Sequence, residues 1–178
     1  MANEGRASRP VGRARGSSSI ENRPVIIGVI SDTHGLLRPE ALAALRGSQF
    51  IIHAGDIGDP QILDRLSEIA PVTAVRGNVD RDAWARKIPA TNVLAVGDVS
   101  IYVLHNIQAL DLKPEAANFA AVIYGHSHTP KQELQKGVLY FNPGSAGPRR
   151  FRLPVSVGRL RIEAGKVDAK ILILETTT

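Results

Sequence analysis

The stretch VIIGVI at residues 25–30, followed directly by SDTHG at residues 31–35, decides how this chain folds. An unbroken and largely β-branched apolar run of this length is typical of a strand that is buried on both faces, as in a parallel sheet. In open α/β sheets, ligands bind at the carboxyl ends of the strands. The stretch therefore predicts an α/β protein whose functional site begins at Ser31.

The alternation of strands and helices continues along the chain. Helices are predicted over residues 39–46, where proline occupies the first turn and Gly47 the stop, and over residues 60–69. Further strands are predicted at residues 50–53, 72–75, 121–124, 138–141, 155–162 and 166–174, with a hairpin of residues 92–96 and 99–104 around Gly97-Asp98. A βαβαβ start followed by a mostly β half favours two packed sheets with helices outside over one doubly wound sheet.

The composition excludes several classes of protein. The chain has no cysteine, so thiolate ligands, disulfides and cysteine nucleophiles are excluded and only nitrogen and oxygen ligands remain. Its apolar runs are much shorter than the roughly 20 residues of a membrane-spanning helix. We therefore expect a protein of the cytoplasm without a membrane partner.

The positive charge is concentrated at the amino-terminal end. Five arginines and two glutamates lie in residues 1–23, which accounts for more than half of the net charge of +5. The remaining body is nearly balanced and poor in aromatic residues, so we expect no stable binding of nucleic acid. Residues 1–23 are predicted to be a disordered basic extension, with a transit peptide as the alternative, and residues 24–178 to form one domain.

Polar residues that can bind metal follow most of the predicted strands. In an extended segment, residues i and i+2 point the same way, so Asp32 with His34, and His126 with His128, each form a fork of two ligands. Asp56, Asn78 and His105 follow three other strands, which makes seven donors that should converge. This number suits two metal ions about 3.5–4 Å apart that share one carboxylate and a bridging hydroxide. Asp56 is the natural bridge.

The charges of these donors favour a phosphate ester as substrate. Two divalent cations held by only two carboxylates leave a positive site, since Asn78 and the imidazoles are neutral. One hydroxide and one phosphodiester anion would neutralise that site, whereas further carboxylates would repel the substrate.

In this order, Asp-Thr-His, Gly-Asp, Gly-Asn-x-Asp, a lone His and Gly-His-Ser-His resemble the calcineurin-like metallophosphoesterase superfamily, particularly its small bacterial and archaeal phosphodiesterases. The resemblance covers about residues 25–150 and includes Asn-Pro-Gly-Ser at residues 142–145. It implies a four-layer αββα sandwich of two mixed sheets flanked by helices. It also implies one metal on Asp32, His34, Asp56 and His128, and another on Asp56, Asn78, His105 and His126.

The chain departs from the family pattern at two positions. Val79 stands where many members have histidine, and a valine cannot protonate a leaving group, so weaker activity on poor leaving groups is expected. Asn106 follows His105 where several relatives have Gly-His, which affects the local loop and the substrate contacts rather than the ligand itself.

Other residues have both a functional and a structural interpretation. His53 is expected either to orient a metal ligand or to be a hydrogen-bonded core histidine. Asp80 is expected to support the loop of Asn78. Arg149 is the candidate for a contact with substrate phosphate, although arginines at such a position, Arg150 included, are more often a solvated rim. Trp84 is expected to be a packing residue or an interface anchor.

The sequence thus predicts a phosphodiesterase that acts on a small phosphodiester with two divalent ions. Asp56 and Asn78 are assigned to catalysis, and Asn78 and Arg149 to substrate contact. Mn²⁺ is the first expectation among Mn²⁺, Fe²⁺, Zn²⁺, Co²⁺ and Ni²⁺. The alternatives are a non-catalytic interaction scaffold of the same fold, as in the metallophosphoesterase-like subunit of retromer, and a phosphomonoesterase or nuclease. A homo-oligomer is possible.

Overall fold

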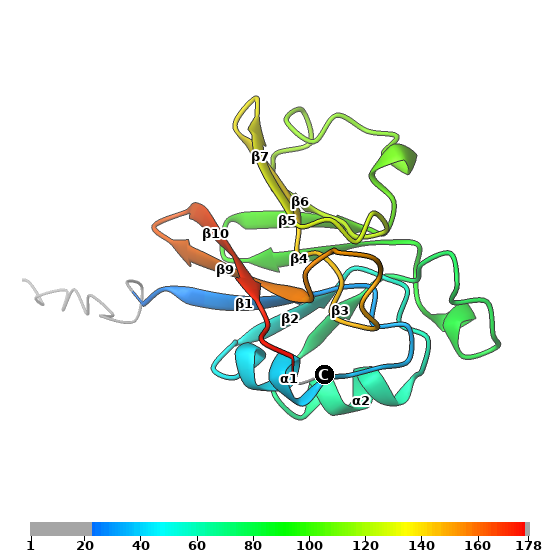
Figure 1. Cartoon of the computed structure of the whole chain (residues 1–178). Coiled ribbons are helices and arrows are strands. Elements are labelled where there is room, and N and C mark those ends of the chain that lie inside the picture. Colours follow the sequence, from blue (N-terminus) through cyan, green and yellow to red (C-terminus); the bar gives the residue numbers. More distant parts are fainter. Residues whose placement is uncertain (1–22, 177–178) are drawn as a thin grey trace, which may run out of the picture.

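The computed structural model describes residues 23–176, arranged as two five-stranded sheets with helices on one outer face (Figure 1). The predicted basic extension of residues 1–23 lies outside the described residues except for Arg23. The elements are β1 (Val25–Ile30), α1 (Pro39–Leu45), β2 (Phe50–His53), α2 (Gln61–Ser67), β3 (Val72–Ala74), the 3₁₀ turn η1 (Ala85–Lys87), β4 (Thr91–Val96), β5 (Val99–Leu104), the 3₁₀ turn η2 (Ile107–Ala109), β6 (Phe119–Ile123), β7 (Lys131–Gln135), β8 (Val138–Asn142), β9 (Ser156–Glu163) and β10 (Lys166–Ile173).

The first sheet has the order β10-β9-β1-β2-β3. Its strands β1, β2 and β3 are parallel, whereas β9 and β10 join antiparallel to the other side of β1. The parallel strands arise from the predicted βαβαβ start, because each crossover passes through a helix. Their carboxyl ends consequently lie at one edge of the sheet.

The second sheet has the order β4-β5-β6-β8-β7. Strands β5, β6 and β8 are parallel, and β4 and β7 flank them antiparallel. Both sheets are therefore mixed, as predicted.

Two apolar layers hold the sheets and helices together. The main core lies between the sheets and contains Ile27, Ile101 and Phe141, all without exposed surface. A second core lies between the first sheet and its helices, where α1 contributes Ala41 and Leu45. Helix α1 begins at Pro39, whose fixed φ suits the first helical turn.

Fewer elements pack on the outer face of the second sheet than on the outer face of the first sheet. Tyr102, Leu104 and Tyr124 form an apolar cluster there, and Ile107 and Leu110 from the segment around η2 pack on it. This segment contains a single 3₁₀ turn in place of a full helix. The two mixed sheets and their helices confirm the predicted α/β sandwich, although in the described residues α-helices cover the first sheet alone and the segment around η2 takes the place of the fourth layer. In residues 23–176, no helix has both the length and the apolar character needed to cross a membrane.

The main error of the sequence-based prediction in the fold is β7, which it did not anticipate. Residues 131–135 are KQELQ, without an apolar run, because this edge strand is largely exposed on both faces. Its backbone pairing with β8 decides its structure. Helix α2 is also shorter than predicted and ends at Ser67.

Candidate metal centre

The predicted ligands follow strands of both sheets and meet at one edge. Asp32 and His34 follow β1, Asp56 follows β2, Asn78 follows β3, His105 follows β5, and His126 and His128 follow β6. In Figure 1 this edge lies on the right, opposite the β9-β10 hairpin. The structure thus brings all seven side chains together from five loops.

A first ligand group consists of Asp32, His34 and His128, whose ligand atoms all lie within 4.8 Å of one another. The Nε2 atom of His128 is 3.2 Å from Asp32 Oδ1 and 3.2 Å from His34 Nε2. Asp56 Oδ2 lies 3.9 Å from His34 Nε2, so the fourth predicted ligand of this metal borders the group.

A second group surrounds the other side of Asp56. The Nε2 atom of His105 lies 3.3 Å from Asp56 Oδ2 and 3.1 Å from Asn78 Oδ1. Nδ1 of His126 is also 3.1 Å from Asn78 Oδ1. Asp32 approaches this side too, because Asp32, Asp56 and His105 have ligand atoms within 4.8 Å of one another. The two carboxylates therefore lie between the two groups of imidazoles.

The donor atoms fit divalent cations. Oδ2 of Asp32 accepts hydrogen bonds from Ser31 Oγ and the His126 backbone N–H, whereas Oδ1 is buried without a hydrogen-bond partner. A buried carboxylate oxygen without a partner is costly unless a cation compensates it. In His105, Nδ1 lies 2.7 Å from the Ala54 carbonyl oxygen, to which its proton can be donated, which leaves the Nε2 lone pair facing Asp56 and Asn78. Nitrogen and oxygen donors of this kind suit first-row divalent metals.

The backbone at this edge adopts an uncommon conformation. Five of the seven predicted ligands have positive φ, namely Asp32 (54°), His34 (46°), Asp56 (54°), His126 (69°) and His128 (58°). Aspartate and histidine are among the non-glycine residues that tolerate this region best. Such conformations cluster at functional sites, where the surrounding structure holds them in place.

Backbone hydrogen bonds hold the ligand loops against one another. The N–H groups of Asp32 and His34 donate to the carbonyl oxygens of Gly55 and Asp56, at 3.0 and 2.9 Å. Gly125 lies so close to the β1 loop that a Cβ at this position would overlap Ser31 Oγ and lie 2.7 Å from Asp32 Oδ2. The loops after β1, β2 and β6 are therefore fixed relative to one another.

Asp80 joins the loops after β2 and β3. Its carboxylate accepts backbone N–H groups from Ile57 (3.1 Å), Gly58 (2.9 Å) and Gly77 (2.8 Å). It is 5% exposed. This geometry supports the predicted role beside Asn78, and it extends that role to the loop of Asp56.

His53 is fully buried beneath the same loops. The Thr33 hydroxyl donates to the Ile57 carbonyl oxygen, so it accepts from Nε2–H of His53 at 2.9 Å, while Nδ1 accepts the Gly55 N–H at 3.2 Å. Both ring nitrogens are thus used by the neutral imidazole. Burial lowers the pKa of His53 from 6.5 to about 4. The hydrogen bonds of His53 are thus made to residues next to the predicted ligands Asp32, His34 and Asp56.

The shifted pKa of His53 predicts a pH-dependent stability of the metal-free protein. Between pH 6.5 and 4 the unfolded chain binds a proton at His53 and the folded chain does not, so stability falls as the pH falls. Between pH 7 and pH 5, His53 is expected to lower the free energy of unfolding by about 2 kcal/mol. We expect His53→Gln to show a pH dependence smaller by about that amount, measured by urea unfolding in chelator at both pH values. An unchanged pH dependence would contradict this account.

Burial and charge act in different directions on the ligands themselves. Burial lowers the pKa of His34, although the carboxylates of Asp56 and Asp32 partly oppose it. For His105, burial is outweighed by the hydrogen bond with Asp56 and by nearby carboxylates, so its pKa is raised. Burial would raise the pKa of Asp56, but His105 and the Val79 N–H lower it. In the absence of metal, His105 and Asp56 thus stabilise each other's charged forms.

The remaining predicted residues differ in their surroundings. Arg149 is exposed, and Val79 is 44% exposed while its N–H donates to Asp56 Oδ1 at 3.0 Å. Asn106 caps η2 by accepting the Gln108 N–H. Trp84 packs against the core beneath the helices. Phe151, for which no role was predicted, is an exposed aromatic residue that lines a hollow with His126 and His128.

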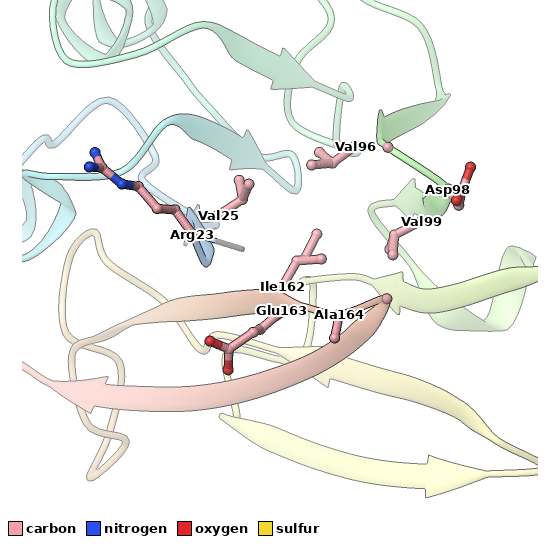
Figure 2. A pocket seen from close by; sticks show the side chains of 10 residues that line it. Arg23, Val25, Val96, Asp98, Val99, Ile162, Glu163 and Ala164 are labelled. Carbon is pink, nitrogen blue, oxygen red and sulfur yellow. The ribbon is translucent and has the colours of Figure 1, made fainter. Parts of the chain in front are cut away.

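Hollows lie on the surface at both ends of the sheets. One of about 390 Å³ borders the centre and is lined by Asn78, His105 and His126 together with apolar Leu104 and Ala109. Another of about 530 Å³ lies at the opposite end, between the β4-β5 and β9-β10 hairpins (Figure 2). It contains none of the predicted ligands, so the metal chemistry belongs to the first hollow.

Known proteins are similar to this chain in sequence and in fold. Residues 25–165 match the model of the calcineurin-like phosphoesterase superfamily domain. A protein of Methanocaldococcus jannaschii named "Probable metallophosphoesterase" is 34% identical over 165 residues, which cover 85% of this chain and 82% of that protein. Phosphodiesterase YfcE of Escherichia coli K12 is 27% identical, covering 73% and 84% of the two chains.

A solved structure supports the same assignment. The crystal structure of a conserved uncharacterized protein and predicted phosphoesterase from Streptococcus pneumoniae has a TM-score of 0.69 and 27% identity, and covers 85% of this chain and 90% of that chain. The match of the family model extends over most of the chain, including all seven predicted ligands. The resemblance of the motifs is thereby confirmed: the chain belongs to the calcineurin-like phosphoesterase superfamily.

Proposed function

We propose that this metal-dependent phosphoesterase hydrolyses phosphodiester bonds with two divalent ions, and that Mn²⁺ is its working metal. The observation that carries the proposal is the position of Asp56, whose Oδ2 faces His34 of one ligand group and His105 of the other. A carboxylate between two sets of nitrogen donors is suited to hold two cations at once.

The residues divide into two sets that share Asp56. Asp32, His34 and His128 would hold one ion with it, and Asn78, His105 and His126 the other. When bound, the two ions would supply Lewis acidity at the phosphate and lower the pKa of water. Asp80 and His53 would act by positioning, because their hydrogen bonds fix the backbone on either side of Asp56.

Asn78 is proposed to contact both the metal centre and the bound substrate. Its amide oxygen lies 3.1 Å from both His105 Nε2 and His126 Nδ1, and it borders the hollow beside the centre. Being neutral, it leaves the site more positive than a carboxylate would, which favours an anionic phosphate. Arg149, which is exposed and precedes Arg150 of the hollow lined by His126 and His128, would add a guanidinium to the phosphate contacts.

Val79 favours diesters with good leaving groups over monoesters. It lies next to Asn78 and exposes an apolar side chain that can neither donate a proton nor stabilise a leaving oxygen. We expect Val79→His to raise hydrolysis of a monoester with a poor alkoxide leaving group, such as glycerol 3-phosphate, at least about tenfold, since a positioned acid contributes about 10²–10⁴-fold. Val93→His is the matched control, because Val93 is exposed to a similar extent on β4. An equal gain in both variants would contradict the role of Val79.

The function itself is tested with purified wild-type protein, stripped of metal and reloaded with Mn²⁺. We expect hydrolysis of bis(p-nitrophenyl) phosphate to exceed that of p-nitrophenyl phosphate, and metal analysis to give two ions per chain. Faster hydrolysis of the monoester would refute the diester specificity. Bound metal without turnover of either ester would instead favour a scaffold of the same fold.

A further inference from the structure

Phe151 is the one exposed aromatic residue in the part of the chain that the structure describes. Its side chain is 94% exposed, and its backbone has a φ of 54°. It occupies a turn that the Leu153 N–H closes by donating to the Arg150 carbonyl oxygen at 3.1 Å. A bulky residue rarely adopts this conformation, and an exposed phenylalanine gains nothing from burial. Both features suggest that the residue contacts a ligand.

The turn lies beside the metal centre. A hollow of about 150 Å³ is lined on one side by Arg150, Phe151 and Leu153, and on the other by His126, Ser127 and His128. Its two histidines are the predicted ligands that follow β6. A phosphate ester bound at the centre would therefore have Phe151 beside one of its substituents.

The segment that precedes the turn is anchored to the ligand loop after β1. Ser145 Oγ donates to the Asp32 carbonyl oxygen at 2.9 Å, and the Ala146 N–H donates to the Ser31 carbonyl oxygen at 3.0 Å. Arg38 Nε donates to the Gly147 carbonyl oxygen at 3.2 Å. These bonds fix the start of the segment that carries Phe151 to the centre.

Arginines surround Phe151 in the sequence Arg149-Arg150-Phe151-Arg152. Arg150 lines the same hollow as His126 and His128, so its guanidinium lies beside the ligand loop after β6. An aromatic face beside cationic groups matches a planar ring that is attached to a phosphate.

We propose that residues 149–153 form a subsite for a nucleobase, so that the substrates are small nucleotide esters. This inference rests on the proposed function, because the phosphate must bind at the metal centre. Bases stack on aromatic side chains with little sequence preference. A single aromatic residue serves one base, whereas proteins that track a strand use several along a basic groove. The subsite thus favours a mononucleotide unit over a polymer.

The test compares 5′-AMP with ribose 5-phosphate, which carries a hydroxyl at C1′ in place of the base, on Mn²⁺-loaded protein by isothermal titration calorimetry. We expect AMP to bind about tenfold tighter or more. Phe151→Ala should remove most of this preference, and Phe151→Trp should keep it. Leu134→Ala is the matched control, because Leu134 is 72% exposed on β7 and should leave the preference unchanged.

Equal affinities of the wild-type protein for both ligands would overturn the inference, and so would a preference that persists in Phe151→Ala. Turnover of bis(p-nitrophenyl) phosphate by the same preparation separates the two proposals. Turnover combined with equal affinities would reject the nucleobase subsite and leave the phosphodiesterase intact. An AMP preference that depends on Phe151, without turnover of any diester, would keep the subsite as a nucleotide-binding site and reject the proposed activity.

Discussion

Asp56→Asn should lower Mn²⁺-dependent hydrolysis of bis(p-nitrophenyl) phosphate by more than about 100-fold. Replacing residues that merely support metal ligands costs about 10–100-fold, and a ligand shared by two ions should cost more. The amide oxygen can still accept the Val79 N–H, as Oδ1 of Asp56 does at 3.0 Å. The amide NH₂ would then face His105 and His34, where it cannot bind a cation.

Metal content and folding decide how this result is interpreted. We expect Asp56→Asn to retain fewer than two ions per chain after gel filtration, measured by inductively coupled plasma mass spectrometry. Asp98→Asn makes the same chemical change at an exposed position in the β4-β5 hairpin, away from the centre, and should retain both activity and metal. A folded Asp56→Asn protein with near wild-type turnover would refute the assignment of Asp56 as the bridge.

Gly77→Ala should destabilise the fold and impair metal binding together. A Cβ at Gly77 would overlap Oδ1 and the backbone nitrogen of Asp56, and would lie 2.7 Å from its carboxyl carbon. Forcing extra atoms into a packed site typically costs about 1–3 kcal/mol. Since the overlap involves Asp56 itself, we expect a loss at the upper end of this range by urea unfolding, together with weaker Mn²⁺ binding.

Gly97→Ala separates this steric effect from the general cost of replacing a glycine. Gly97 has a φ of +56°, and a Cβ there would contact nothing within 4 Å. Its replacement should cost about 1 kcal/mol from backbone strain and leave the metal affinity unchanged. Equal losses of stability and affinity in both variants would show that the contact between Gly77 and Asp56 is not the cause.

The convergence of the ligands could be predicted because it depends on topology. VIIGVI and the later apolar runs predicted parallel strands, whose carboxyl ends meet at one edge. Asp32 and His34 are two residues apart, as are His126 and His128. In an extended segment, this spacing was expected to point both side chains of each pair the same way. The structure instead places all four residues at positive φ. The pairs converge because tight turns aim them, which alternation in a strand could not reveal.

Other features depend on contacts between distant residues. The three N–H groups that Asp80 accepts come from two loops, so local sequence could suggest a supporting role but not its extent. The tautomer of His53 follows from the Thr33 hydroxyl, which is 20 residues away in sequence. Strand β7 has no apolar pattern because it is an exposed edge. Phe151 beside arginines was a visible signal, but its exposure is known only from the fold.

The left-handed turns at the ligand residues have a consequence for how the protein acquires its metals. Backbone hydrogen bonds hold the turns at Asp32 and His34, and Oδ2 of Asp32 holds the turn at His126 by accepting its N–H. Metal binding then has to order little of the chain, unlike in domains that fold only around their metal. An apo-protein that is already shaped can exchange one ion for another without unfolding. Its occupancy in a cell should therefore follow the supply of free manganese, iron and zinc, so enzyme isolated from different growth media should differ in metal content.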